Sequence, residues 1–309
     1  MQSNHAADKT PVVWWFRDGK AGHDNQSRGL IIALRRLIAL DLHEVPLPSW
    51  GRLLIDAVAA SFHGGVGLPN PDLLIGAGHA THLPLLAARR ARGGRSIVLM
   101  KPSLPRGWFD LCVIPRHDGV APAPGVLVTD GLLNTIQAPA GKARDRGLML
   151  IGGPSVHHHW SNRELIEQLR AIVAHDPGVH WVIASSRRTP ADTVDALRAL
   201  APAQIDFIHH EATEATWLPA QLARAATVWV SEDSVSMLYE ALTAAAATGV
   251  LAVPRRGADR VTRAIDELIH SGRVTSFADW LAGRALRAAD GFNEALRVAA
   301  WIKQTWLSA

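Results

Sequence analysis

The chain has 309 residues, of which 48% are hydrophobic and 19% charged, and its formal net charge is +4. This composition is typical of a folded globular protein and excludes intrinsic disorder, collagen and coiled coil. The length suggests two domains, each with its own core. A net charge of +4 is too small to indicate a concentrated basic face, so no nucleic-acid partner is expected.

The cysteine content and the first ten residues indicate in which cellular compartment the protein is expected. Cys112 is the single cysteine, so no intramolecular disulfide can form and no cysteine cluster can hold a metal. The opening MQSNHAADKT lacks the pattern of a signal peptide, and no stretch reaches the roughly 18 apolar residues of a membrane span. We therefore expect a cytoplasmic protein.

Short apolar runs alternate with stretches of helical periodicity, beginning with a run at 12–16 and a helix over about 25–40. This alternation indicates the α/β class. Nearly continuous apolar runs are typical of parallel strands that are covered on both faces. Further strands of the first half are expected at 42–45, 73–75, 97–100, 111–114 and 126–129.

The pattern lapses between Gly131 and Arg146, and a second series of strands and helices follows. We expect two Rossmann-like doubly wound domains that face each other across a cleft, with ligand sites beyond the carboxyl ends of the strands. The predicted domains are 1–140 and 141–290, followed by a helical segment at 291–309. Strands of the second series are expected at 148–151, 181–184, 205–208, 228–230 and 250–253, with helices at about 162–175, 191–200, 218–225 and 234–247.

The last segment predicts a helix over about 291–306 with one apolar stripe. We expect it to pack back on the N-terminal domain, because its other face is not rich in Lys and Arg. Peripheral contact with the inner face of a membrane stays open as an alternative, and the sequence does not indicate an oligomeric state. The stripe consists of Phe292, Leu296, Ala299, Ile302 and Trp306.

A polar segment with two glycines follows the first strand and precedes the first helix. Glycine lets the backbone approach a ligand, and a helix N-terminus offers unpaired N–H groups. The pattern is neither that of a P-loop nor GxGxxG. A turn that only caps the helix would explain the glycines but not the gathering of polar side chains. The candidate residues here are Asp18, Lys20, Gly22, His23 and Gln26.

Polar residues recur at other strand ends of the first half. Gly78 and His79 follow the third predicted strand, and His117 and Asp118 follow the fifth. Each is a weak signal alone, because a histidine in a loop is commonly just solvated. Their recurrence matters because carboxyl ends of parallel strands open at one edge of a sheet.

The second half offers a candidate phosphate site. Gly152, Gly153 and Ser155 follow its first strand and could cradle a phosphate. The three histidines at 157–159 resemble a metal site, but consecutive residues cannot easily all face one ion, and no acidic residue stands at helical spacing. No metal is therefore expected.

Two later strand ends carry polar groups that suit a nucleotide. Ser186, Arg187 and Arg188 precede a helix, and paired arginines there suit a diphosphate, although an ordinary solvated turn would look the same. Ser234 can cap the next helix, and Glu240 lies nearly two turns along it. That carboxylate could hold ribose hydroxyls, the alternative being a surface position.

Five segments in matching order resemble the mitochondrial fission Elm-type family over nearly the whole chain. Members of that family are similar to the GT-B class of glycosyltransferases, which implies an acceptor-binding N-terminal domain and a nucleotide-sugar-binding C-terminal domain. The stretch that contains Met237 and Glu240 is similar to the ribose-binding helix of the peptidoglycan N-acetylglucosaminyltransferase. The five segments are 18–26, 115–118, 152–155, 186–190 and 233–237.

The resemblance implies a metal-independent, inverting glycosyltransferase with a nucleotide sugar as co-substrate and no further cofactor. His23 stands where the related enzyme has its catalytic histidine, and Asp18 or Asp118 would orient it. The acceptor would be a cell-envelope glycan or lipid. The alternative is a non-catalytic adaptor that recruits a protein partner. A nucleotide-sugar epimerase is less supported, because GxGxxG and Tyr-x-x-x-Lys are both missing.

Overall fold

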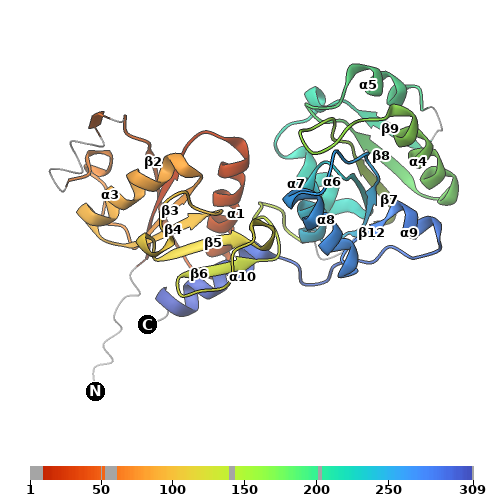
Figure 1. Cartoon of the computed structure of the whole chain (residues 1–309). Coiled ribbons are helices and arrows are strands. Elements are labelled where there is room, and N and C mark those ends of the chain that lie inside the picture. Colours follow the sequence, from red (N-terminus) through yellow and green to blue (C-terminus); the bar gives the residue numbers. More distant parts are fainter. Residues whose placement is uncertain (1–9, 50, 53–60, 139–142, 201–203, 308–309) are drawn as a thin grey trace. The chain divides into compact units, whose positions relative to one another are not determined.

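The structure is a computed structural model that describes residues 10–49, 51–52, 61–138, 143–200 and 204–307 (Figure 1). The chain divides into two compact units. The first consists of Met1–Thr135 together with Glu294–Ala309, and the second of Ile136–Asn293. In the described part of the chain, no helix is long and apolar enough to cross a membrane.

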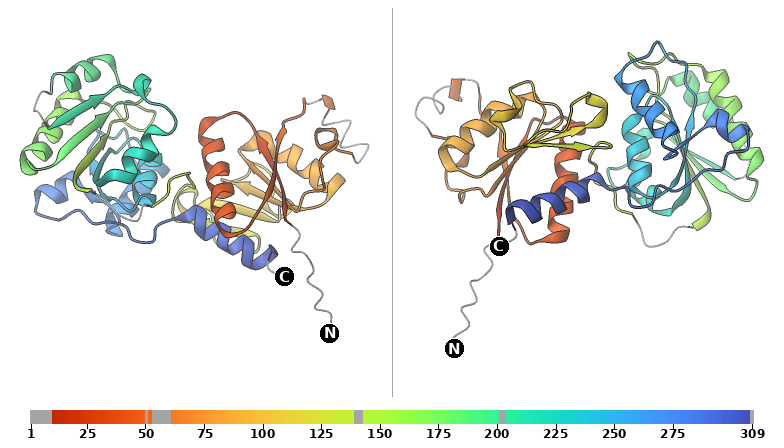
Figure 2. Two further views of the ribbon diagram at one scale, coloured as in Figure 1. Left: turned by 180° about the vertical axis from the view of Figure 1, so that it is seen from behind. Right: turned by 60° about the horizontal axis from the view of Figure 1, so that its bottom comes forward.

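Within the described residues, the first unit has a six-stranded parallel sheet in the order β2-β1-β3-β4-β5-β6. Helices cover both of its faces (Figures 1 and 2). The strands are β1 (Val12–Arg17), β2 (Asp41–Pro46), β3 (Leu73–Ala77), β4 (Arg95–Leu99), β5 (Leu111–Pro115) and β6 (Val126–Thr129), and the helices are α1 (Ala21–Leu37), α3 (His82–Arg92) and α10 (Glu294–Ile302).

Strand β1 shows why the apolar runs form central strands. Successive side chains of a strand point to opposite faces, so a run that is apolar throughout must be covered on both. Val13 and Trp15 pack in the core beneath α1 and α10. Trp14 and Phe16 pack in the core on the other face, beneath α3. The run at 12–16 is therefore buried from both sides.

Helix α10 comes from the far end of the chain and packs along α1 (Figure 2). Its buried stripe is Ala295, Val298, Ala299 and Ile302, which differs from the predicted one. Phe292 precedes the helix and belongs to the second unit, where it stacks on Tyr239 at a centroid distance of 6.1 Å. The α-helix also stops at Ile302, and residues 303–307 form a wider π-helical turn.

The second unit contains, in its described residues, a six-stranded parallel sheet in the order β12-β11-β10-β7-β8-β9. Trp181 and Trp229 are buried in its core. The strands are β7 (Ala143–Leu150), β8 (His180–Ala184), β9 (Ile205–Ile208), β10 (Ala225–Ser231), β11 (Ala247–Leu251) and β12 (Thr275–Ser276), and the helices are α4 (Asn162–His175), α5 (Ala191–Arg198), α6 (Trp217–Arg224), α7 (Val235–Thr243), α8 (Arg260–His270) and α9 (Phe277–Leu281).

The predicted α/β class with two doubly wound units is confirmed, whereas several element boundaries were wrong. Helix α1 begins at Ala21, earlier than predicted, so His23 and Gln26 lie in its first two turns. Helix α7 ends at Thr243 because Ala245 adopts a left-handed φ of 54°. The alanine-rich stretch after it therefore turns into β11 where helical periodicity had suggested a longer helix.

The strand order fixes where each sheet can bind a ligand. In doubly wound sheets, ligands bind beyond the carboxyl ends of the strands, at the point where the strand order reverses. In the first unit this point lies between β1 and β3, which flank each other in the sheet. In the second unit it lies between β7 and β10.

Candidate functional site

The carboxyl ends of β1 and β3 bring together Asp18, His23 and Gly78. Nδ1 of His23 lies 2.7 Å from Oδ2 of Asp18. The Asp18 side chain is 3% exposed and the His23 side chain 17%. Gly78 has a φ of 82°, and a Cβ there would overlap the His23 ring. Only glycine therefore fits beside the histidine, on both backbone and steric grounds.

Neighbouring bonds hold this pair in place. The backbone N–H of Lys20 donates to Oδ1 of Asp18 at 3.1 Å, which leaves Oδ2 for the imidazole. The hydroxyl of Thr81 donates to the carbonyl of Gly78 at 2.8 Å and pins the turn after β3. Because the carboxylate accepts from Nδ1–H, the Nε2 atom of His23 keeps its lone pair and can accept a proton.

The other predicted residues of the first unit occupy different surroundings. Gln26 is buried on α1, and Lys20 is exposed at the residue before that helix. Gly22, in the first turn of α1, faces open space, and His79 is exposed in the turn that follows Gly78. These four residues lie in the segments that flank the Asp18–His23 pair.

His117 and Asp118 follow β5, which β4 separates from β3. Nε2 of His117 lies 3.9 Å from Oδ1 of Asp118, and both side chains are largely buried. The sequence left open whether Asp18 or Asp118 would orient His23. The structure places Asp18 in hydrogen-bond contact with it.

In the second unit, the loop after β7 packs against residues that follow β10. The N–H of Gly152 donates to the Ser231 hydroxyl at 2.7 Å, and the N–H of Gly153 donates to Oδ2 of Asp233 at 3.0 Å. A Cβ on Gly152 would overlap the Asp233 carboxylate. In this structure the two glycine N–H groups therefore bind protein acceptors.

The turn after β8 closes onto the same loop. Nη2 of Arg188 lies 2.6 Å from Oδ2 of Asp233, and Nη1 donates to the carbonyl of Gly153 at 3.1 Å. The Ser186 hydroxyl donates to the carbonyl of Gly152 at 3.1 Å. Arg187 beside them is exposed. The predicted glycine loop and paired arginines are thus neighbours at the switch point between β7 and β10.

Helix α7 carries the last predicted group. Ser234 stands at the N-cap position, but its side chain makes no capping bond, so it does not cap the helix as expected. Glu240 and Met237 are both half-buried and lie one turn apart on α7. Ser155 uses its hydroxyl within its own loop, accepting the N–H groups of His157 and His158 at 3.1 Å each.

The three consecutive histidines have separate surroundings. His157 contacts the Asp259 carboxylate through Nδ1. His158 is fully buried, and its Nε2 has no hydrogen-bond partner among the described residues. His159 is exposed, and its backbone N–H donates to the carbonyl of Pro254 at 2.8 Å. Across the described residues, no group of three or more His, Cys, Asp or Glu side chains is placed to hold a metal ion.

Burial makes His158 a source of acid sensitivity. Desolvation lowers its pKa from 6.5, and the carboxylates of Glu232 and Asp233 offset this only in part. The unfolded chain binds this proton more readily, so the free energy of unfolding should fall as the pH drops below about 6.5, by at most about 1.4 kcal/mol per pH unit. Urea unfolding between pH 8 and 5.5 measures this slope.

His158→Gln should flatten that slope. His82, whose pKa burial also lowers, serves as the internal reference because it keeps its contribution in the variant. If the free energy of unfolding of His158→Gln fell with pH as steeply as that of the wild type, the acid sensitivity would come from groups other than His158.

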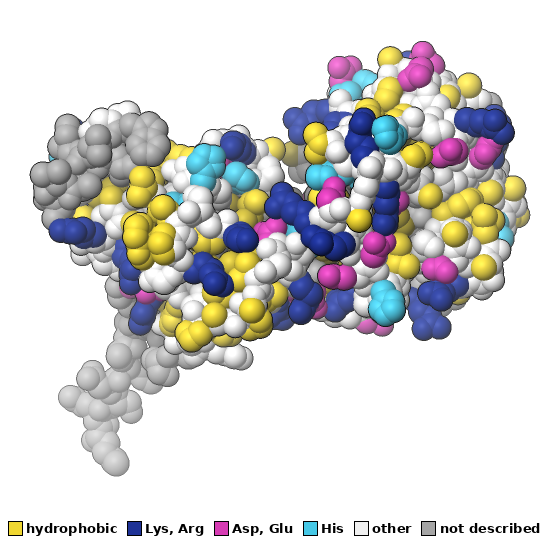
Figure 3. Space-filling view, in the orientation of Figure 1, with side chains coloured by type: hydrophobic (Ala, Val, Ile, Leu, Met, Phe, Trp, Pro, Cys, Tyr) yellow, Lys and Arg dark blue, Asp and Glu magenta, His cyan; other side chains and the backbone are white. Residues whose placement is uncertain are grey.

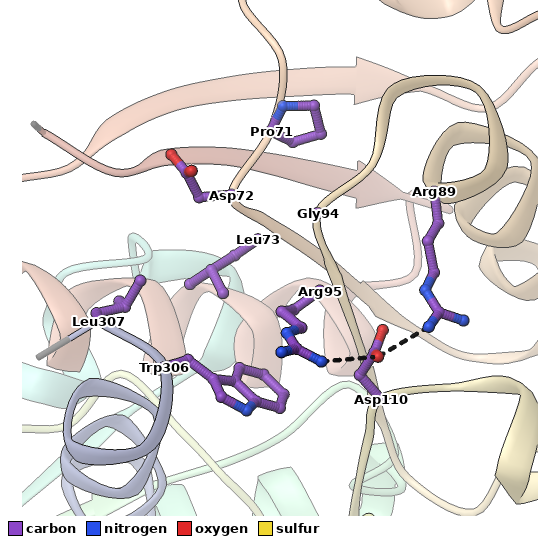
Figure 4. A pocket seen from close by; sticks show the side chains of 9 residues that line it. All are labelled: Pro71, Asp72, Leu73, Arg89, Gly94, Arg95, Asp110, Trp306 and Leu307. Carbon is purple, nitrogen blue, oxygen red and sulfur yellow. Dashed lines mark hydrogen bonds and ion pairs between the residues drawn. The ribbon is translucent and has the colours of Figure 1, made fainter. Parts of the chain in front are cut away.

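A separate cavity of about 380 Å³ lies at the opposite, amino edge of the first sheet (Figure 4). Arg89 and Arg95 point toward Asp110 from different elements, and Trp306 forms one wall. The predicted site residues do not line it. On the face shown in Figure 3, Lys and Arg side chains occur on both units, interspersed with acidic ones.

Sequence reasoning missed Ser231, Asp233 and Asp259 as site residues. Asp233 was visible as part of a recognised segment, but its packing against Gly152 depends on β10 lying next to β7. Asp259 lies after β11, at the N-cap of α8, in a stretch where the sequence predicted neither a helix nor a site. Strand order, which the sequence does not show, brings these groups together.

Solved structures of UDP-N-acetylglucosamine 2-epimerase resemble this chain. The enzyme from Methanocaldococcus jannaschii has a TM-score of 0.58 at 12% identity, over 96% of this chain and 99% of that one. The enzyme from Neisseria meningitidis, bound to UDP-GlcNAc, has a TM-score of 0.51 at 10% identity, with the same coverage. A third structure of UDP-N-acetylglucosamine 2-epimerase has a TM-score of 0.57 at 14% sequence identity, over 96% of each chain. These likenesses show the fold, which is GT-B-like as predicted.

The sequence itself gives one family match. The family model described as mitochondrial fission ELM1 matches residues 21–306. No curated protein matches the sequence at a significant level. The matched range includes His23, the glycine loop and α7, whereas Asp18 and Lys20 lie just before it.

Proposed function

The chain belongs to the mitochondrial fission ELM1 family, and from this premise we propose that it is a sugar-nucleotide enzyme, specifically a metal-independent glycosyltransferase of inverting type. The observation that carries the proposal is the Asp18–His23 pair at the switch point of the first sheet. An imidazole whose Nδ1–H is held by a buried carboxylate is the arrangement that a general base needs. The fold likeness to an epimerase bound to UDP-GlcNAc supports a sugar nucleotide as donor.

His23 would act on the acceptor. As the acceptor oxygen forms its bond to the anomeric carbon, Nε2 of His23 takes the hydroxyl proton, and the bond to the nucleoside diphosphate breaks with its electron pair. Asp18 stabilises the imidazolium that forms and keeps the ring oriented. Inversion follows because the acceptor attacks the face opposite the leaving group.

The second unit would hold the donor. Arg188, bonded to the glycine loop, would supply positive charge together with its exposed neighbour Arg187, and the first N–H groups of α7 would add the positive end of the helix dipole. Glu240, in the second turn of α7, would accept hydrogen bonds from the ribose hydroxyls. No metal is needed in this scheme, since guanidinium groups and helix ends carry the leaving charge.

The proposal also names an acceptor and a place in the cell where the reaction occurs. We place the reaction on a cell-envelope glycan or lipid at the cytoplasmic face of the membrane. This rests on the similarity of the 233–240 segment to the corresponding helix of the peptidoglycan N-acetylglucosaminyltransferase. Neither a nucleic-acid partner nor a further cofactor is part of it.

A second candidate function is epimerisation of a sugar nucleotide. It is favoured by the likeness to solved UDP-N-acetylglucosamine 2-epimerases over 96% of this chain. The missing GxGxxG is weak evidence against an epimerase, because that pattern marks dinucleotide sites. The fold alone does not separate epimerisation from sugar transfer. Incubation with UDP-GlcNAc without an acceptor distinguishes them, since only an epimerase produces an isomeric sugar nucleotide under those conditions.

The proposal is tested by nucleotide binding and by Glu240→Ala. Sugar nucleotides and nucleoside diphosphates should raise the melting temperature of the wild-type protein, because a ligand that binds the native state stabilises it by mass action. Glu240→Ala should weaken that binding by about 1–3 kcal/mol through the loss of charge-assisted hydrogen bonds. Isothermal titration calorimetry measures the difference.

Glu267→Ala on the exposed face of α8 is the matched control and should bind as the wild type does. Equal affinities of wild type and Glu240→Ala would remove Glu240 from the site. A protein that binds no nucleotide at all would favour the other reading, an adaptor that recruits a protein partner.

A further inference from the structure

The two glycine N–H groups of the loop after β7 bind acceptors of the protein itself. Oδ2 of Asp233 accepts the N–H of Gly153 at 3.0 Å and lies 2.6 Å from Nη2 of Arg188. The N–H of Gly152 is taken by the Ser231 hydroxyl. A carboxylate thus accepts a backbone N–H of this loop that could otherwise bind a phosphate oxygen.

This carboxylate is held deep in the site. The Asp233 side chain is 0% exposed, and its Oδ1 has no hydrogen-bond partner among the described residues. The Cα of Gly152 packs so closely against it that any larger residue at 152 would overlap the carboxylate. The negative charge is therefore fixed beside the loop and little screened by water.

Positive and negative side chains at this edge of the sheet largely offset each other. Arg188 brings one positive charge to the loop, which Asp233 offsets, and the exposed Arg187 lies next to it in the same turn. Glu232, the acidic neighbour of Asp233, is itself paired with Arg255. The site therefore has positive charge left for a diphosphate, but less than its two arginines suggest.

Donor and product differ in the charge that this site would meet. In a sugar nucleotide the distal phosphate is a diester with a single negative charge. In the released nucleoside diphosphate the same phosphate has a second ionisable group, whose pKa near 6 leaves it mostly ionised at neutral pH. The product thus places about one more negative charge near Asp233 than the donor does.

We propose that Asp233 is a specificity-determining residue, whose buried charge makes the site prefer a sugar nucleotide over the free nucleoside diphosphate and so speeds product release. This rests on the proposed function, because it assumes that the diphosphate lies at the glycine loop. The repulsion acts on both ligands but is stronger for the product. Arg188, which Asp233 partly neutralises, would then hold the donor without trapping the leaving group.

Asp233→Asn tests this, because the amide oxygen can still accept the N–H of Gly153 while the charge is gone. The dissociation constants of UDP and UDP-GlcNAc are measured by calorimetry for the full chain at pH 7.5. UDP should bind at least about tenfold more tightly to the variant. UDP-GlcNAc should gain less, so the ratio of the two constants shifts toward the product. Product inhibition by UDP should strengthen in parallel.

Two further variants keep the test sharp. Asp206→Asn makes the same chemical change at an exposed carboxylate of β9 and should leave both constants unchanged. If Asp233→Asn does not fold, as judged by circular dichroism and melting temperature, Asp233→Ser replaces it, since its hydroxyl can accept the same N–H. The same shift of the ratio is expected there.

The outcomes separate this inference from the proposed function. If both ligands bind and Asp233→Asn weakens both, Asp233 only positions Arg188, and the inference is overturned while the function stands. A ratio equal to that of the wild type overturns it as well. If no protein in the set binds UDP or UDP-GlcNAc, the proposed function fails and this inference fails with it.

Discussion

His23→Ala is expected to lower the rate of sugar transfer roughly 10²–10⁴-fold while leaving donor affinity and melting temperature nearly unchanged. The imidazole would act on the acceptor proton in the transition state, and in the proposed scheme the donor is held by the second unit. The His23 side chain is 17% exposed, and in the variant water can enter its place while the Lys20 N–H still donates to the Asp18 carboxylate, so only a small loss of stability is expected. Transfer rate, donor affinity and melting temperature measured on one variant distinguish a base from a structural histidine.

Two comparison variants sharpen this test. Asp18→Asn should also reduce the rate, because an amide no longer favours the tautomer with its proton on Nδ1, and it should change the pH profile of transfer. His63→Ala removes an exposed histidine of the same unit and should have no effect. Unchanged transfer in His23→Ala would shift the role to another group, such as His117. A large loss of melting temperature instead would make the histidine structural.

Arg188→Ala is expected to destabilise the second unit by about 1–3 kcal/mol, because it leaves a buried carboxylate without its ionic partner, although the Arg188 side chain is itself 41% exposed. Nη2 of Arg188 lies 2.6 Å from Oδ2 of Asp233, whose side chain is 0% exposed. The remaining N–H of Gly153 cannot replace a guanidinium. Urea unfolding followed by tryptophan fluorescence measures the change.

The double variant Arg188→Ala with Asp233→Asn separates the cost of the orphaned charge from that of the lost arginine side chain. It should be more stable than Arg188→Ala alone, since the amide tolerates burial without a cation. Arg187→Ala is the matched control, an exposed arginine of the same turn, and should change stability by less than about 0.5 kcal/mol. Additive effects of the two substitutions would show that the pair is not coupled.

Much of the fold could be predicted because local patterns of apolar and polar residues determine its strands and helices. The run at 12–16 is apolar throughout and is buried on both faces in β1. Helical periodicity located α4 and α5 near their observed bounds. Local pattern did not predict where α7 ends. The alanines after it were expected to be helical, but Ala245 turns the chain into β11.

For the candidate site, the sequence determined which residue types follow each strand, since strands and the loops after them are local features. It placed Asp18, His23 and Gly78 at strand ends, and the glycine loop and Arg188 likewise. Only the tertiary structure decided which of these meet, because strand order depends on packing between distant segments. The Asp18–His23 contact spans only five residues and is local, but the placement of β1 beside β3 brings Gly78 against it, and the placement of β7 beside β10 packs Asp233 against Gly152.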